Sequence, residues 1–230
     1  MSGHSKWATI HRQKEVKDVK KGAIFTKLAV AITIAVKQGR GLQLALEKAK
    51  QFNMPKENIQ RAIDRATEAG GENLEEAMYE GFLPGGVAVV IEVLTDNKLR
   101  TQQQVREILD KGGGSMTGAG AVSYMFEHQG ELRITNQGLR DEDELKIIDL
   151  NADEIIKDEG EWLIYCHKEK TKEVKEKLEE MGYKVVGAEL VMKPTTIVEI
   201  GSEETRNRIE RLVLQLEELD DVHKVWTNYA

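Results

Sequence analysis

The spacing of hydrophobic residues changes near residue 76, and this change limits the fold more than any other feature of the sequence. Before it, apolar residues recur every three to four positions, which indicates amphipathic helices. We expect three of them, one after Gly22, one from Leu42 with Phe52 on its apolar face, and one from Pro55 to Gly70. None can bury its apolar face alone, so the three should pack into a small bundle.

Beyond residue 76, short alternating runs separated by turn residues indicate strands and helices. One complete β-α-β-β-α-β pattern, residues 130–194, lies between the halves of a second unit, residues 76–129 and 195–230. We call these the inserted domain and the split domain. The strands expected in the split domain are Val87–Leu94, Val122–Phe126, Thr196–Ile200 and Val222–Thr227.

The predicted fold class is therefore α+β. A basic arm and a three-helix bundle, residues 1–75, come first, and two nested ferredoxin-like α/β domains follow, one inserted in the other. Each should be a sheet with two helices on one face.

Charge also divides the chain. Residues 1–70 contain 14 Lys and Arg against 6 Asp and Glu, whereas the rest contains 19 against 34. A basic head on an acidic body suits oriented binding to a polyanion, and nucleic acid is the commonest polyanion in the cytoplasm. A solvated charged face without a partner is the alternative interpretation.

The basic arm carries an aromatic residue among its cations. Each Lys or Arg can neutralise a phosphate, and Trp7 can either stack on an unpaired base or pack beneath the bundle. Single-stranded or structured RNA suits this arm better than duplex DNA, since no helix shows the Arg, Asn and Gln pattern of a major-groove reader. The residues expected to contact nucleic acid are Lys6, Trp7, Arg12, Lys14, Lys17, Lys20 and Lys21.

Signatures of catalysis and metal binding are missing from the sequence. No two histidines have the spacing of a helical metal site, and the single cysteine, Cys166, excludes an internal disulfide and a Cys-based zinc site. The apolar run from Ala23 to Val36 is too short to cross a bilayer and contains Lys27. We expect a cytoplasmic monomer with no cofactor, no metal, no membrane contact and no enzymatic activity.

Two polar groups remain as candidate sites. A second polar site, or else a helix cap, is expected at a strand-to-helix junction formed by Asp96, Asn97, Arg100 and Thr101. Glu80 precedes the Pro84-Gly85-Gly86 turn, so an acidic site or a plain strand-entry turn fits there. An enzyme with a carboxylate site near Glu80 and Asp96 is the remote alternative.

Several motifs, in order along the whole chain, resemble the YebC family. They are Met1–Ile10 (MSGHSKWATI), Gly22 with Phe25-Thr26-Lys27-Leu28, Asn53-Met54-Pro55-Lys56, Tyr79-Glu80-Gly81, Pro84-Gly85-Gly86-Val87-Ala88, Leu94-Thr95-Asp96-Asn97, Val122-Ser123-Tyr124-Met125-Phe126 and Leu219-Asp220-Asp221-Val222, followed by Thr227-Asn228. The connector at residues 38–42 is shorter than the usual loop of that family.

The resemblance implies a helical N-terminal domain and two α/β domains. Some members have been described as probable DNA-binding transcriptional regulators. Others, including mitochondrial relatives, are translational activators that act at the ribosome when proline-rich peptides stall synthesis. By position, the resemblance adds Lys27 to the nucleic-acid contacts. It makes ribosomal RNA or tRNA the expected target, with ribosomal proteins as further partners, and promoter DNA the alternative.

Overall fold

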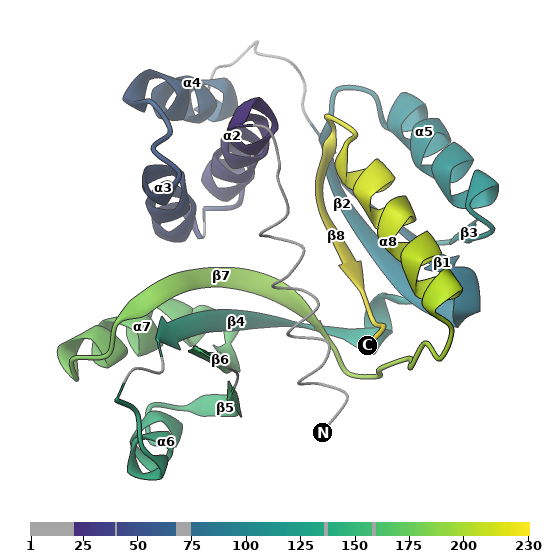
Figure 1. Cartoon of the computed structure of the whole chain (residues 1–230). Coiled ribbons are helices and arrows are strands. Elements are labelled where there is room, and N and C mark those ends of the chain that lie inside the picture. Colours follow the sequence, from purple (N-terminus) through teal and green to yellow (C-terminus); the bar gives the residue numbers. More distant parts are fainter. Residues whose placement is uncertain (1–20, 40, 68–74, 136–137, 158–159) are drawn as a thin grey trace. The chain divides into compact units, whose positions relative to one another are not determined.

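The computed structural model describes residues 21–39, 41–67, 75–135, 138–157 and 160–230 (Figure 1). Within these ranges the chain is mixed α+β, with three helices followed by two four-stranded sheets. The α+β class expected from the hydrophobic spacing, a helical region followed by two sheet domains, is confirmed. We keep the name split domain for the first sheet with its two helices, and inserted domain for the second sheet with its two.

The three N-terminal helices are α2 (Lys21–Gln38), α3 (Leu42–Gln51) and α4 (Lys56–Thr67). They share one apolar core, whose buried members are Leu28, Ile32, Ala49, Met54 and Ala62. The hydroxyl of Thr33 donates to the carbonyls of Ala29 (2.9 Å) and Ala62 (3.0 Å), so a buried polar group ties α2 to α4. The bundle therefore has both the apolar and the polar contacts that hold its helices together.

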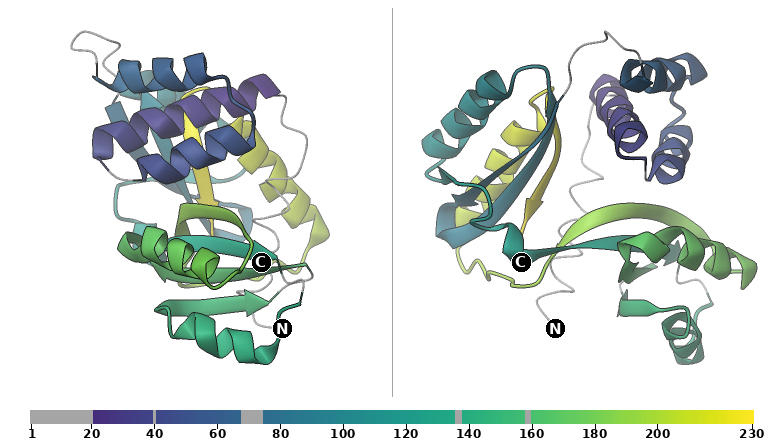
Figure 2. Two further views of the ribbon diagram at one scale, coloured as in Figure 1. Left: turned by 90° about the vertical axis from the view of Figure 1, so that its left-hand side faces the viewer. Right: turned by 180° about the vertical axis from the view of Figure 1, so that it is seen from behind.

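The split domain has the sheet order β3-β1-β2-β8, and every adjacent pair is antiparallel. Its strands are β1 (Glu75–Leu83), β2 (Val87–Thr95), β3 (Ser115–Thr117) and β8 (Val222–Thr227). Helices α5 (Lys98–Lys111) and α8 (Glu203–Glu217) lie side by side on one face of this sheet (Figure 2). Gly112 allows their close approach, because an added Cβ there would collide with Leu212 of α8.

Four segments of the split domain differ from the sequence expectation, and one of them is the short strand β3, which was not expected. Residues 75–83 form β1, although no strand was expected there. The segment Val122–Phe126 is mostly a 3-10 turn, η2 (Ser123–Met125), because backbone N–H groups there bond to a side chain of β1. The segment Thr196–Ile200 contributes a single bridge, Val198 with Tyr229, and the carbonyl of Thr196 accepts from the side chain of Asn228.

The inserted domain contains β4 (Phe126–Thr135), α6 (Asp141–Ile148), β5 (Ala152–Lys157), β6 (Glu161–His167), α7 (Thr171–Glu180) and β7 (Val185–Pro194). Its sheet order, β5-β6-β4-β7, is the ferredoxin-like order expected of a β-α-β-β-α-β unit. Its core joins both helices to one face of the sheet through residues such as Leu132, Ile147, Ile164 and Leu178.

The chain enters and leaves the inserted domain at one place. Just before β4, the carbonyl of Met125 accepts hydrogen bonds from the N–H (2.8 Å) and the hydroxyl (3.0 Å) of Thr195, which follows β7. The two connecting segments are thus held together where the insertion begins and ends. Among the described helices, none combines the length and the apolar character that crossing a membrane requires.

Candidate nucleic-acid interface

Most of the arm residues expected to bind nucleic acid lie outside the described residues. These are Lys6, Trp7, Arg12, Lys14, Lys17 and Lys20. Lys21 begins α2, but its side chain also lies outside the described part. Lys27 is described, and its side chain is half-buried on α2, where burial lowers the pKa of its ammonium group. Of the described cations, Lys27 is therefore poorly placed to reach a phosphate.

A basic surface that the sequence analysis did not single out lies at the turn between α3 and α4. Lys50 in the last turn of α3 and Lys56 in the first turn of α4 are both exposed. Between them in sequence, Phe52 leaves 43% of its surface exposed. We call Lys50, Phe52 and Lys56 the α3–α4 turn patch. Cations flanking an exposed aromatic ring are the combination that grips a phosphate chain and stacks an unpaired base.

The geometry of this turn corrects the expectation that Phe52 belongs to the bundle core. Helix α3 ends at Gln51, and Asn53 adopts a left-handed conformation (φ 55°) that turns the chain away. The N–H of Met54 then donates to the carbonyl of Ala49 (2.9 Å), and the Met54 side chain is only 6% exposed. Met54 occupies the core, and Phe52 is left outside it.

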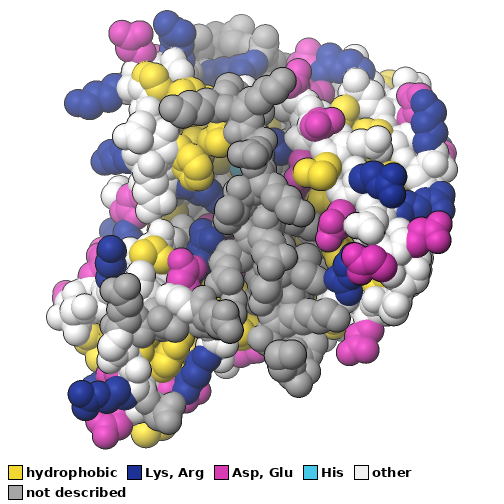
Figure 3. Space-filling view, in the orientation of Figure 1, with side chains coloured by type: hydrophobic (Ala, Val, Ile, Leu, Met, Phe, Trp, Pro, Cys, Tyr) yellow, Lys and Arg dark blue, Asp and Glu magenta, His cyan; other side chains and the backbone are white. Residues whose placement is uncertain are grey.

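Helix α4 extends the basic surface beyond the turn. Arg61 and Arg65 are exposed on this helix. Both partners of the 3.9 Å ion pair of Arg61 with Glu57 are exposed to solvent, so replacing Glu57 by a phosphate as the partner of Arg61 would cost little free energy. Among the described side chains of α2, α3 and α4 there are seven Lys and Arg and three Asp and Glu. Lys and Arg side chains gather around α3 and α4 in the upper left of Figure 3.

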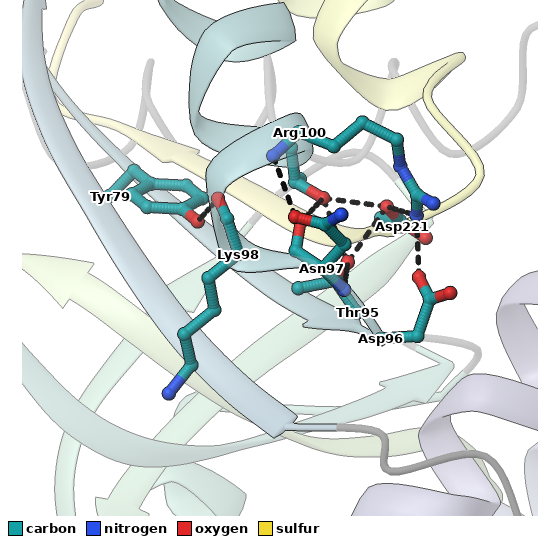
Figure 4. A network of polar contacts seen from close by, with 8 residues as sticks. Tyr79, Thr95, Asp96, Asn97, Lys98, Arg100 and Asp221 are labelled. Carbon is teal, nitrogen blue, oxygen red and sulfur yellow. Dashed lines mark hydrogen bonds and ion pairs between the residues drawn. The ribbon is translucent and has the colours of Figure 1, made fainter.

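The second polar site expected from the sequence is a closed hydrogen-bonded network (Figure 4). We call it the Asp221 network, and its members are Thr95, Asp96, Asn97, Arg100, Thr101 and Asp221. Asn97 caps α5, since its side chain accepts from the N–H of Arg100 (3.0 Å). The Arg100 guanidinium donates to both Asp96 (2.7 Å) and Asp221 (2.8 Å). The main hydrogen-bonding groups of the Asp221 network are therefore engaged with one another.

Asp221, just before β8, is the centre of this network. Its Oδ2 accepts from the hydroxyls of Thr101 (2.6 Å) and Thr95 (3.0 Å) in addition to Arg100. Burial raises the pKa of Asp221, but these donors outweigh burial and leave the pKa below its ordinary value. The hydrogen bonds of Arg100 to Asp221 and Asp96 raise the pKa of Arg100. The charged pair therefore locks the end of β2, the start of α5 and the start of β8 together.

Glu80, the other carboxylate considered from the sequence, holds a loop. It is 4% exposed on β1, and its two oxygens accept from the N–H groups of Gly120 (2.8 Å), Val122 (2.7 Å) and Ser123 (3.0 Å). Burial raises the pKa of Glu80, but these backbone donors outweigh it, so the pKa lies below the ordinary value. Within the described ranges, no cluster of His, Cys, Asp and Glu is arranged to hold a metal ion.

Comparison with known families identifies the chain. A family model described as the TACO1/YebC protein N-terminal domain matches residues 5–69, and one described as the TACO1/YebC second and third domain matches residues 74–229. The chain belongs to the TACO1/YebC family. The resemblance drawn from the sequence motifs is confirmed.

TACO1/YebC relatives match over nearly the whole chain. A probable transcriptional regulatory protein of Caldanaerobacter subterraneus is 44% identical, with 99% of this chain and 98% of the relative covered. One from Listeria monocytogenes has the same identity and coverage. The crystal structure of a conserved hypothetical protein from Aquifex aeolicus is similar with a TM-score of 0.82 and 39% identity, covering 93% of this chain and 91% of that one.

Several TACO1/YebC motifs of the split domain meet in space. Leu94-Thr95-Asp96-Asn97 and Leu219-Asp220-Asp221-Val222 join in the Asp221 network, and Tyr79-Glu80-Gly81 binds the segment around Val122. Asn53-Met54-Pro55-Lys56 builds the α3–α4 turn. In the last motif, Asn53 and Met54 shape the turn, whereas Lys56 points its charge to solvent.

Proposed function

We propose that this TACO1/YebC chain is a nucleic-acid-binding regulator that acts in translation and contacts ribosomal RNA or tRNA through its basic N-terminal region. The observation that carries the proposal is the α3–α4 turn patch. In it, an exposed aromatic residue lies between two exposed lysines in sequence, on a helical bundle with an excess of cations. The arm residues Lys6 to Lys21 would add to the same interface.

The physical basis of binding is electrostatic. Each lysine that neutralises a phosphate releases condensed counterions, so affinity should fall steeply with added salt. Stacking of a base on Phe52 would add about 1–3 kcal/mol and would require an unpaired base. The acidic remainder of the chain repels the same phosphates, which limits binding to one orientation.

The ribosome is the target that the family resemblance favours. At the ribosome, the protein would relieve stalls of translation at proline-rich sequences. It would do so as a cytoplasmic monomer without enzymatic activity. The acidic inserted domain, with 18 Asp and Glu against 11 Lys and Arg in residues 127–193, would suit contact with basic ribosomal proteins.

Transcriptional regulation through DNA is the second candidate, favoured by the names of the relatives, which are called probable transcriptional regulatory proteins. The same basic surface would serve, with phosphate contacts along a duplex. A preferred DNA sequence would then be required, because phosphate contacts alone carry no sequence information.

Co-sedimentation with ribosomes tests the proposal. At about 0.15 M salt, the wild type should pellet with ribosomes, and the double variant Lys50→Glu, Lys56→Glu should stay in the supernatant. The matched control is Lys170→Glu, Lys184→Glu, which makes the same charge change at two exposed lysines of the inserted domain. It should pellet like the wild type.

Promoter-length DNA separates the two candidates. If all three proteins pellet equally with ribosomes, the α3–α4 turn patch has no role in ribosome binding. Tighter and more salt-resistant retention on DNA than on ribosomes, with a preferred sequence, would establish the transcriptional reading instead.

A further inference from the structure

We propose that the loop before the inserted domain is a second contact for the same RNA, with Tyr124 stacking on an unpaired base. This inference rests on the proposed function and adds a contact on the split domain. Tyr124 leaves 71% of its surface exposed. Among the described residues its hydroxyl has no hydrogen-bond partner, so no hydrogen bond of this group holds the fold of its own domain.

The backbone that carries Tyr124 is fixed on both sides. The Glu80 carboxylate binds the N–H groups of Val122 and Ser123, and the Val122 side chain is fully buried. On the other side, the N–H of Met125 bonds to the carbonyl of Val122 (2.9 Å), and the carbonyl of Met125 accepts from Thr195. A ring held by a preformed loop loses little conformational entropy when a ligand stacks on it.

The segment that forms this loop carries no charged residue of its own. No Asp, Glu, Lys or Arg occurs in the fifteen residues from Gly112 to Phe126, the longest such run in a chain that is 32% charged. Elsewhere the split domain carries an excess of carboxylates that would repel a phosphate chain. The loop itself adds nothing to that repulsion, so it favours the approach of a phosphate chain more than the acidic segments do.

The loop also leaves space at its surface for a ligand. Gly118 and Gly120 are exposed, and an added Cβ at either one would meet no atom within 4 Å. Because these two glycines carry no side chain, the loop leaves room for a flat base beside Tyr124. An exposed aromatic face without charged partners fits base stacking, which is sequence-tolerant and needs an unpaired nucleotide.

Affinity for RNA tests the proposal directly. The probe is a short unstructured RNA with a fluorescein label, together with the duplex formed from the same sequence, and fluorescence anisotropy reports binding to the full chain. Tyr124→Ala should weaken binding of the unstructured RNA about tenfold, the effect of one lost stack, and leave duplex binding unchanged. Tyr124→Phe should keep the wild-type affinity because it keeps the ring.

Leu99→Ala is the matched control. Leu99 lies on α5 with 72% of its surface exposed, so its truncation removes a similarly exposed apolar side chain from the same domain. It should leave RNA affinity unchanged. Since neither residue is buried, both variants should melt like the wild type, and a fall in affinity cannot then be assigned to unfolding.

The outcomes separate this inference from the proposed function. If Tyr124→Ala binds RNA like the wild type while Lys50→Glu, Lys56→Glu does not, the second contact is overturned and the basic interface stands. If Tyr124→Ala loses ribosome binding but keeps its affinity for protein-free ribosomal RNA, Tyr124 contacts a protein and the proposal is wrong. A wild type that binds no RNA removes both proposals.

Discussion

The hydroxyl of Thr101 lies 2.6 Å from Oδ2 of Asp221, a residue 120 positions later in the chain. This contact and the 2.8 Å pair of Arg100 with the same oxygen join the first turn of α5 to the start of β8. The whole inserted domain is encoded between the two partners. The Asp221 network therefore closes the split domain after the chain has passed through another domain.

Asp221→Asn should lower the stability of the protein measurably. Asparagine keeps the shape and can still accept from one threonine, but it loses the charge that binds Arg100. We expect a loss of about 1.5–3 kcal/mol in the free energy of unfolding, the range for a hydrogen bond to a charged group. Urea unfolding followed by circular dichroism measures it. Asp220→Asn, a neighbouring exposed residue, should cost almost nothing, and equal effects of the two would show that the network is not stabilising.

The lowered pKa of Glu80 predicts how the stability of the protein depends on pH. Its pKa is lower in the folded chain than its ordinary value of about 4.3, so the unfolded chain binds more protons in this range. The stability that Glu80 contributes is therefore fully present above its ordinary pKa and lost as the pH falls through the lower folded value. Glu80→Gln should flatten the decline of unfolding free energy as the pH falls below about 4.3, the ordinary pKa of a glutamate. A decline of unchanged slope would contradict the role given to the three backbone bonds.

Much of the architecture could be predicted because it depends on local patterns. Helical spacing in residues 22–67 and alternation in residues 130–194 each arise from a single face packing on a core. β1 was missed for a physical reason. The buried carboxylate of Glu80 and the side-chain-free Gly81 interrupt the apolar alternation, and both make sense only with segments some 35 to 43 residues later in place.

The site was predicted less well than the fold. The position of Phe52 fits the apolar spacing of α3, so spacing alone assigns it to the core. Asn53 before Pro55 is the signal that places it in a turn, since a helix ends readily at such a residue. The partners of Arg100 could not be predicted, because Asp221 is distant in sequence and only the closed sheet brings it near.

Gly81→Ala should destabilise the edge of the split-domain sheet. An added Cβ at Gly81 would come within 2.5 Å of the backbone carbonyl of Ser115 in β3, which cannot move without breaking its pairing with β1. The expected cost is about 1–3 kcal/mol, as for other overpacked sites. Gly118→Ala is the control, since its Cβ would point into open space and should change stability by no more than about 0.5 kcal/mol. Thermal unfolding of the two variants in parallel decides the point.

Substitutions of Phe52 and Met54, which lie in the same turn, should have separate effects on RNA binding and on stability. Phe52→Ala removes a ring that is 43% exposed, so it should weaken binding to unstructured RNA about tenfold with little change in melting temperature. Met54→Ala removes a side chain that fills the bundle core and should cost about 2–5 kcal/mol in stability. Anisotropy with labelled RNA and differential scanning calorimetry give the two readouts. If Phe52→Ala melts early and binds RNA normally, the ring is a packing element and the α3–α4 turn patch loses its stacking residue.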